Sequence, residues 1–180
     1  MNLPNKITIF RILLVPVFVS SMIINKTNNL WPCMIFIIAS VTDTLDGNIA
    51  RKYNLVTTFG KFLDPLADKI LTAAAFIMLV ELGKIPAWIC IIILSRELII
   101  TAFRTIAASE GITIAASPFG KLKTIFQMLA IILLLGNNMF FINYGIPMDQ
   151  IMVYICLFFT VLSGIDYIIK NKKVLDLKNI

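Results

Sequence analysis

Apolar residues in this chain gather into long runs, separated by short polar stretches. Most runs are long enough for a helix to cross a bilayer, which takes about 20 residues. Polar residues 1–6 precede the first run, and we expect them to form a short N-terminal interfacial segment. Residues 136–147, rich in Gly and Asn, predict a loop. The pattern predicts an all-α, polytopic integral membrane protein with six transmembrane helices, at residues 7–24, 31–53, 59–82, 86–108, 120–135 and 150–169.

Composition agrees with this class of protein. Hydrophobic residues make up 59% of the chain and its mean hydropathy is +0.91, well above the range of a soluble globular protein. Lys6 and Arg11 before the first run resemble the start of a signal peptide, but no convincing small-residue cleavage site follows. We therefore expect a true span there. Without internal repeats or a long linker, the chain predicts one membrane-embedded domain over residues 1–180.

Positive charge is distributed unequally between the two sides of the predicted membrane. Lys26 and Lys84 fall on one side, whereas every other Lys and Arg falls on the opposite side. The positive-inside rule then places both termini at the cytoplasmic face. The net charge of +6 suits an anionic leaflet and anionic substrates. Nucleic acid is not an expected partner, because the basic residues flank apolar spans without interleaved aromatic residues.

Four carboxylates interrupt the second and third predicted spans. A charged side chain at the centre of a spanning helix costs about 2.5–3.5 kcal/mol, so these groups should face a wet cavity and have a function there. Residues three or four apart share a helix face, which gives two polar stripes. The first stripe is Asp43, Asp46, Gly47 and Ala50, with Arg51 beside its end, and the second is Gly60, Asp64 and Asp68.

These two stripes, set face to face, predict a metal site. The chain has no His, and its three cysteines (Cys33, Cys90 and Cys156) lie in apolar stretches without metal-ligand or redox spacing. A donor set made of carboxylates suits hard cations, Mg²⁺ or Mn²⁺, bound together with substrate phosphates. Two such ions could hold the attacking and leaving oxygens of a phosphoryl displacement. The small residues leave room for a bulky ligand.

Basic residues form a second cluster further along the chain. Arg96 and Arg104 are eight residues apart, so they lie near one helix face about two turns apart. With Lys121 and Lys123 they could form an anion pocket beside the metal site. The alternative is that these charges only set orientation or pair with neighbouring acids. That alternative is weakest for Arg96, because an arginine inside a span needs a partner.

The acidic motif resembles the signature of the CDP-alcohol phosphotransferase family. Every fixed position of the pattern D-x2-D-G-x2-A-R-x8-G-x3-D-x3-D is met from Asp43 to Asp68. The stretches P-N-K-I-T-x-x-R from Pro4, S-R-E-L from Ser95 and G-K-x-K-T-x-x-Q from Gly120 are similar to one branch, the bacterial phosphatidylglycerophosphate synthases. The likeness covers most of the chain up to about residue 127, and the last span offers no motif.

The resemblance implies a reaction and its setting. The phosphatidyl group of CDP-diacylglycerol is transferred to sn-glycerol 3-phosphate, which gives phosphatidylglycerophosphate and CMP. Two divalent ions, Mg²⁺ or Mn²⁺, assist. The resemblance also implies a homodimer among the lipids of the bacterial cytoplasmic membrane. The positive-inside rule places the acidic motif, and with it the active site, at the cytoplasmic face.

Roles for individual residues follow from the same resemblance. The metal ligands would be Asp43, Asp46, Asp64 and Asp68, and Asp68 would also be the general base. The CDP contacts would be Gly47, Ala50, Arg51 and Gly60. The acceptor-phosphate pocket would be Arg96, Arg104, Lys121 and Lys123. The sequence assigns no role to Asn5, Thr8 or Arg11.

Two other functions compete with this one. The nearer alternative keeps the chemistry and changes the acceptor to inositol phosphate, serine or phosphatidylglycerol. The further alternative is a cation transporter with intramembrane aspartates. A transporter predicts acids spread through the membrane depth, often on discontinuous helices of repeated halves. Here they gather near one surface on two consecutive predicted helices, which favours the enzyme.

Overall fold

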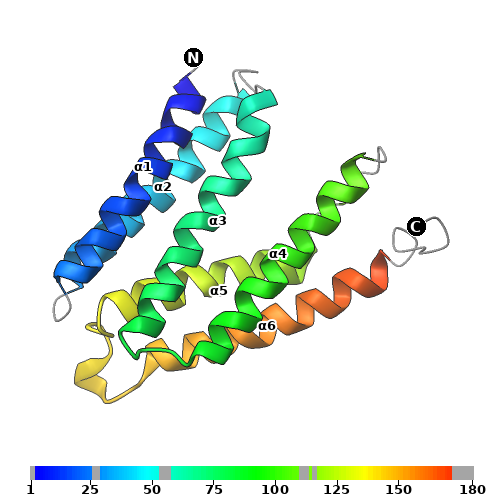
Figure 1. Ribbon diagram of the computed structural model, residues 1–180. Helices are drawn as coiled ribbons and strands as arrows, with labels where there is room; N and C mark the ends of the chain where they lie inside the picture. The colour runs from blue at the N-terminus through cyan, green and yellow to red at the C-terminus, as the bar shows by residue number, and fades with distance from the viewer. Residues whose placement is uncertain (1–2, 26–28, 53–57, 110–113, 115–116, 172–180) are drawn as a thin grey trace. The chain divides into compact units, whose positions relative to one another are not determined.

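The computed structural model describes residues 3–25, 29–52, 58–109, 114 and 117–171 (Figure 1). Side chains are described at residues 7–25, 29–42, 66–67, 69–108, 114 and 117–171. Over these parts the chain forms six α-helices and one short 3₁₀ helix. They are α1 (Leu3–Ile24), α2 (Leu30–Lys52), α3 (Thr58–Glu81), α4 (Ala87–Ser109), α5 (Pro118–Leu135), η1 (Ile142–Tyr144) and α6 (Met148–Lys170).

Several helices have the length and apolarity that a membrane span needs. Among the described residues, three qualify, namely Ile7–Ile24 of α1, Pro118–Leu135 and Met148–Lys170, and Leu30–Thr42 is a shorter apolar segment. The helix α4 is 23 residues long but carries Arg96, Glu97 and Arg104. The described residues form helices and no strand, and their three candidate spans are consistent with the predicted membrane protein. The count of six transmembrane helices stays a prediction.

The predicted element boundaries agree closely with the observed helices. From the second span onward, each predicted boundary lies within two residues of a helix end. The predicted interfacial segment is different, because residues 3–6 are the first turn of α1 rather than a separate element. Pro4 is compatible with this position, since the first helical turn has no intrahelical N–H bonds to lose. The predicted loop at 136–147 contains the short helix η1.

The helices α1, α2 and α3, together with residues 132–139, form one compact unit. In this unit α1 packs against both α2 and α3 (Figure 1). Its buried residues recur every three or four positions, at Thr8, Arg11, Val15, Phe18 and Met22. The ring of Phe18 meets that of Phe36 in α2, with centroids 6.1 Å apart. The helix α1 is therefore an integral part of this unit, as expected for a true span.

Lys84 connects the end of α3 to the end of α5 within this unit. Its Nζ donates hydrogen bonds to the backbone oxygen of Leu134 and to Oδ1 of Asn137, both at 2.5 Å. Carbonyls in the last turn of a helix have no partner within the helix, so Lys84 caps α5. Asn137 and Asn138 have φ values of 53° and 54°, and asparagine tolerates this left-handed region better than most residues.

Lys84→Met is expected to destabilise the protein. A hydrogen bond that involves a charged group contributes about 1.5–3 kcal/mol, and each 1 kcal/mol shifts the melting temperature by about 2–4 °C in a chain of this size. We therefore expect a fall of roughly 3–12 °C in detergent. A fluorogenic thiol dye would report unfolding, because Cys33, Cys90 and Cys156 are buried. The control is Lys170→Met, whose side chain is 58% exposed. Equal melting temperatures for Lys84→Met and Lys170→Met would contradict the role of Lys84 as a cap of α5.

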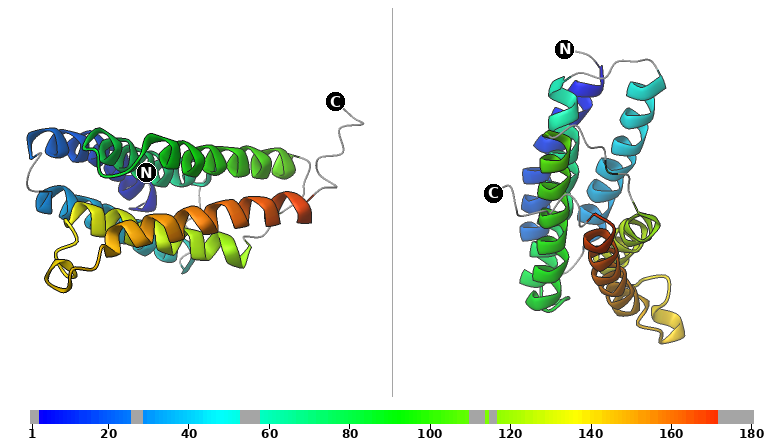
Figure 2. Two further views of the ribbon diagram at one scale, coloured as in Figure 1. Left: turned by 90° about the horizontal axis from the view of Figure 1, so that it is seen from below. Right: turned by 90° about the vertical axis from the view of Figure 1, so that its right-hand side faces the viewer.

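The helices α4 and α6, with most of α5, belong to a second compact unit. Here α4 packs against α6 (Figure 2). Phe126 of α5 stacks on Phe159 of α6, with centroids 5.1 Å apart. The buried face of α6 carries small and polar residues, which are Val153, Cys156, Thr160, Ser163 and Tyr167. This span therefore buries a polar stripe, although the sequence showed no motif there.

Candidate functional site

The acidic motif lies on two helices of the first unit. Its first half is in α2 and its second half in α3, and the backbone is helical at every motif position. The side chains of the predicted metal ligands lie outside the described residues, as do the surroundings of the predicted CDP contacts. These positions are Asp43, Asp46, Asp64 and Asp68, and Gly47, Ala50, Arg51 and Gly60.

Helical register continues the buried face of α2 into the motif. Cys33, Phe36 and Ala39 are 8%, 0% and 0% exposed. Steps of three or four residues lead from Ala39 to positions 43, 46 and 50. The motif positions of α2 are therefore in helical register with the buried residues of this helix.

The same register holds in α3. Leu71, Ala75 and Leu79 are buried, and steps back from Leu71 lead to positions 68, 64 and 60. The end of α2, the start of α3 and the start of α1 lie at one end of this unit (Figures 1 and 2). Both halves of the motif thus occupy the same end of the unit, in helical register with the buried residues of α2 and α3.

Two polar residues of α1 are buried toward this end of the unit. Thr8 and Arg11 are each 1% exposed, on the face of α1 that packs in the unit. A buried guanidinium needs anionic or hydrogen-bonding neighbours, which a carboxylate-rich, phosphate-binding site provides. Burial therefore adds Thr8 and Arg11 to the candidate site. Their signal in the sequence was the stretch P-N-K-I-T-x-x-R, which did not show that both would be buried.

In the second unit, the side chain of Arg96, a residue of α4, passes beside α6 and reaches the start of α5. A Cβ placed on Gly164 would lie 3.5 Å from Cγ of Arg96, and one placed on Gly120 would lie 3.8 Å from its Nη2. Gly120 is in the first turn of α5, where its N–H donates to Oγ of Ser117 at 3.1 Å. Ser117 is thus the N-cap of α5 and Pro118 its first residue, as both residue types favour. The Arg96 guanidinium lies at the N-terminal end of α5.

This end of α5 has the electrostatics of an anion site. The N-terminus of a helix carries a partial positive charge of about +0.5. Arg96 adds a full positive charge, and the exposed Lys121 follows Gly120. In the part of the chain that the structure describes, the buried Nε of Arg96 has no hydrogen-bond partner. An anion with acceptor oxygens, such as a phosphate group, would neutralise the positive charge gathered here and accept a hydrogen bond from this Nε.

The remaining two predicted basic residues have protein partners. Lys123 is 1% exposed and forms an ion pair with Glu97 of α4. Arg104 lies over the ring of Tyr167, with its Cζ 5.7 Å from the centroid. The alternative of pairing with a neighbouring acid therefore holds for Lys123. Arg104 reaches a cation–π partner on α6 that the sequence did not indicate, although polar residues at helical spacing in that span were a usable signal.

Comparison with known proteins identifies the family of this chain. The model of the CDP-alcohol phosphatidyltransferase family matches residues 1–162. A Bacillus subtilis protein named CDP-diacylglycerol–glycerol-3-phosphate 3-phosphatidyltransferase is 44% identical, over 99% of each chain. Proteins of the same name from Rickettsia bellii and Haemophilus influenzae are 40% and 42% identical. These alignments cover 96% of both chains in the first case, and 93% of this chain and 91% of the relative in the second.

Proposed function

We propose that this chain, which belongs to the CDP-alcohol phosphatidyltransferase family, transfers the phosphatidyl group of CDP-diacylglycerol to sn-glycerol 3-phosphate. The products are phosphatidylglycerophosphate and CMP, so the chain is a membrane-bound transferase of phospholipid biosynthesis. The names of three relatives with at least 40% identity support this reaction. The observation that carries the choice of acceptor is the Arg96 guanidinium at the N-terminus of α5, which suits a phosphate monoester.

The acidic motif fits a pair of Mg²⁺ or Mn²⁺ ions. Its donors are all carboxylates, and its positions continue the packed faces of α2 and α3 at one end of their unit. The residues that would hold the ions are Asp43, Asp46, Asp64 and Asp68. When bound, such ions neutralise the charge of the donor's diphosphate and of the departing CMP.

The neighbouring motif residues would bind the cytidine diphosphate part of the donor. Gly47, Ala50 and Gly60 have little or no side chain, so a nucleotide can approach the helix backbone closely. Arg51 would add a positive charge beside the leaving group. Arg11 and Thr8 of α1, both buried, are further candidates for this part of the site.

Asp68 would act as the general base. The acceptor's hydroxyl oxygen attacks the phosphorus of the phosphatidyl group, the bond from phosphorus to the CMP oxygen breaks, and the hydroxyl proton passes to the Asp68 carboxylate. An aspartate ordinarily has a pKa of about 3.9, which makes it a weak base for an alcohol. Exact placement of the hydroxyl must therefore supply much of the rate enhancement.

The basic residues of the second unit would bind the acceptor. Arg96 can offer a phosphate two parallel N–H donors, and the start of α5 adds the positive end of the helix dipole. Lys121 and Arg104 would add positive charge. Lys123 would also belong to this pocket, with Glu97 fixing its position through their ion pair.

The membrane setting follows from charge and length. We assign the whole chain, residues 1–180, to one catalytic domain with six transmembrane helices, in a homodimer of the bacterial cytoplasmic membrane. Lys84 lies beyond the end of α3, at the opposite end of that helix from Asp64 and Asp68. Since most basic residues fall on the motif side, the positive-inside rule supports an active site that faces the cytoplasm.

A single assay tests the acceptor and the metal together. Purified protein in lipid–detergent micelles receives CDP-diacylglycerol and one acceptor at a time, with Mg²⁺, Mn²⁺ or a chelator, and CMP release is measured. We expect release with glycerol 3-phosphate and either ion, and none with the chelator. Serine lacks a phosphate for Arg96 and should fail, whereas inositol phosphate is the closest competitor. Faster release with any other acceptor, or release that survives chelation, would refute the corresponding part of the proposal.

A further inference from the structure

We infer that α6 supplies two positioning residues for the acceptor site, Gly164 for Arg96 and Tyr167 for Arg104. This inference rests on the proposed role of both arginines in binding the acceptor's phosphate. Both α6 residues lie beyond residue 162, where the match to the family model ends. They are also outside every motif that the sequence displays.

Gly164 leaves the space that the stem of Arg96 occupies. A Cβ at this position would lie 3.5 Å from Cγ of Arg96, which is an ordinary van der Waals contact. A methyl group therefore fits, but any atom beyond Cβ would displace the arginine stem. Because the far end of the same side chain lies beside Gly120, Arg96 passes between α6 and the start of α5. Confinement at both ends lowers the entropy that this long side chain loses on binding an anion.

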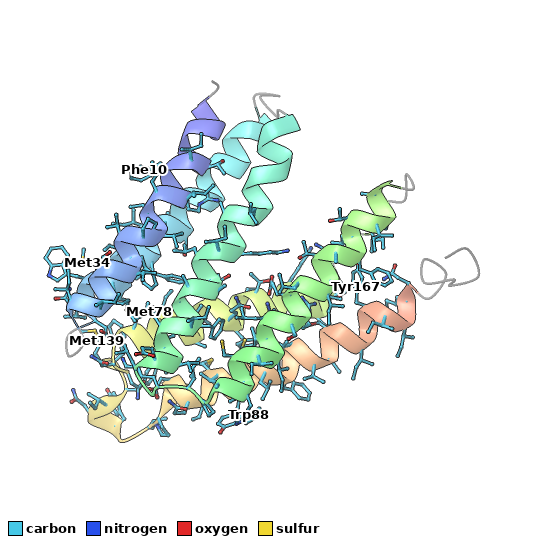
Figure 3. All side chains as sticks on the ribbon, in the orientation of Figure 1. Phe10, Met34, Met78, Trp88, Met139 and Tyr167 are labelled. Carbon is cyan, nitrogen blue, oxygen red and sulfur yellow. The ribbon has the colours of Figure 1, made fainter. Side chains whose placement is uncertain are left out.

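Tyr167 holds Arg104 through its ring. The tyrosine is 2% exposed, and its ring meets Phe103 edge to face, with centroids 5.7 Å apart and an interplanar angle of 86°. Figure 3 shows Tyr167 on α6 in the space toward α4. Arg104 follows Phe103 in α4, and its Cζ lies 5.7 Å from the centroid of the Tyr167 ring. A ring fixed by Phe103 thus gives the exposed Arg104 a defined place.

These contacts make a prediction that simple packing does not make. A residue that only stabilises the fold changes the melting temperature, or affects both substrates alike. A residue that positions Arg96 or Arg104 changes the KM for glycerol 3-phosphate and leaves the KM for CDP-diacylglycerol near the wild-type value. The separation of the two KM values is therefore the critical measurement.

The first test compares Gly164→Val with Gly164→Ala in the full-length enzyme. Valine should raise the KM for glycerol 3-phosphate roughly 10–100-fold, since a displacement of about 1 Å at a binding group can have an effect of that size. Alanine should stay within about twofold of wild type because its methyl group fits. In an Arg96→Gln background, Gly164→Val should raise the KM for glycerol 3-phosphate little further, because the arginine that valine displaces is already absent. Equal KM values for the two Gly164 variants, or a matching rise in the donor KM, would overturn the inference.

The second test uses Tyr167 and holds even if the valine variant fails to fold. Tyr167→Phe keeps the ring and should behave as wild type. Tyr167→Leu removes the ring and should raise the acceptor KM about 3–30-fold, the range of a cation–π interaction. An unchanged KM in the leucine variant would refute the role of Tyr167 while the proposed function still holds. A wild-type enzyme that releases no CMP with glycerol 3-phosphate would overturn both.

Discussion

Asp68→Asn is expected to lower kcat at least a hundredfold and to leave the protein folded in detergent. The amide cannot accept the proton of the attacking hydroxyl, and general base catalysis contributes about 10²–10⁴-fold. Asparagine also removes a negative charge from the predicted metal site. The measurement is CMP release under saturating CDP-diacylglycerol and glycerol 3-phosphate, with melting temperature as the check on folding.

The control for this variant is Asp149→Asn. Asp149 lies in the first turn of α6, where its Oδ1 accepts a hydrogen bond from the N–H of Gln150. The same chemical change there should leave kcat within about twofold, because the Oδ1 of asparagine can accept the same hydrogen bond from Gln150. If Asp68→Asn kept more than a tenth of wild-type activity, Asp68 would not be the base.

Arg96→Gln should raise the KM for glycerol 3-phosphate by roughly 10–100-fold, with little effect on the KM for CDP-diacylglycerol. Hydrogen bonds to charged groups contribute about 1.5–3 kcal/mol, and 1.4 kcal/mol corresponds to a factor of ten in binding. The glutamine is too short to reach the start of α5 and carries no charge. Steady-state kinetics with one substrate varied at a time would measure both effects.

Two comparisons sharpen this test. Arg96→Lys keeps the charge but loses the paired N–H donors, so its KM should fall between those of wild type and Arg96→Gln. Lys170→Gln removes a positive charge from the exposed end of α6 and should change neither KM. If Arg96→Gln impaired the donor instead of the acceptor, Arg96 would belong to the CDP site and the assignment of the second unit would be wrong.

The fold was predictable where it depends on local chemistry. Apolar runs bounded by polar residues located the six α-helices that the structure describes, because a buried or lipid-facing helix needs a long apolar sequence. The error at residues 3–6 came from setting polar residues apart from the apolar run that follows, although a helix can begin with a polar turn and proline fits there. The acidic signature resembled one family, and family membership is confirmed by the match over residues 1–162. The roles of its aspartates stay predictions.

The basic cluster shows what local chemistry leaves open. Spacing placed Arg96 and Arg104 near one face of a helix, but it did not distinguish an anion pocket from simple charge pairing. In the structure Lys123 forms an ion pair with Glu97, and Arg104 lies over the ring of Tyr167. The guanidinium of Arg96 lies at the N-terminus of α5. Each of these contacts joins residues from different helices.

The sequence by itself determined the membrane class, the helices, the family and the residues that share each helix face. Periodicity suffices for the helix faces, because 3.6 residues per turn relates neighbours along one helix. The long apolar runs and the acidic signature carried the rest. Only the tertiary structure decided that α6 contributes to the basic cluster and that Thr8 and Arg11 are buried. Partners on different helices depend on side-chain packing between them, and no repeat within a single helix encodes which faces will meet.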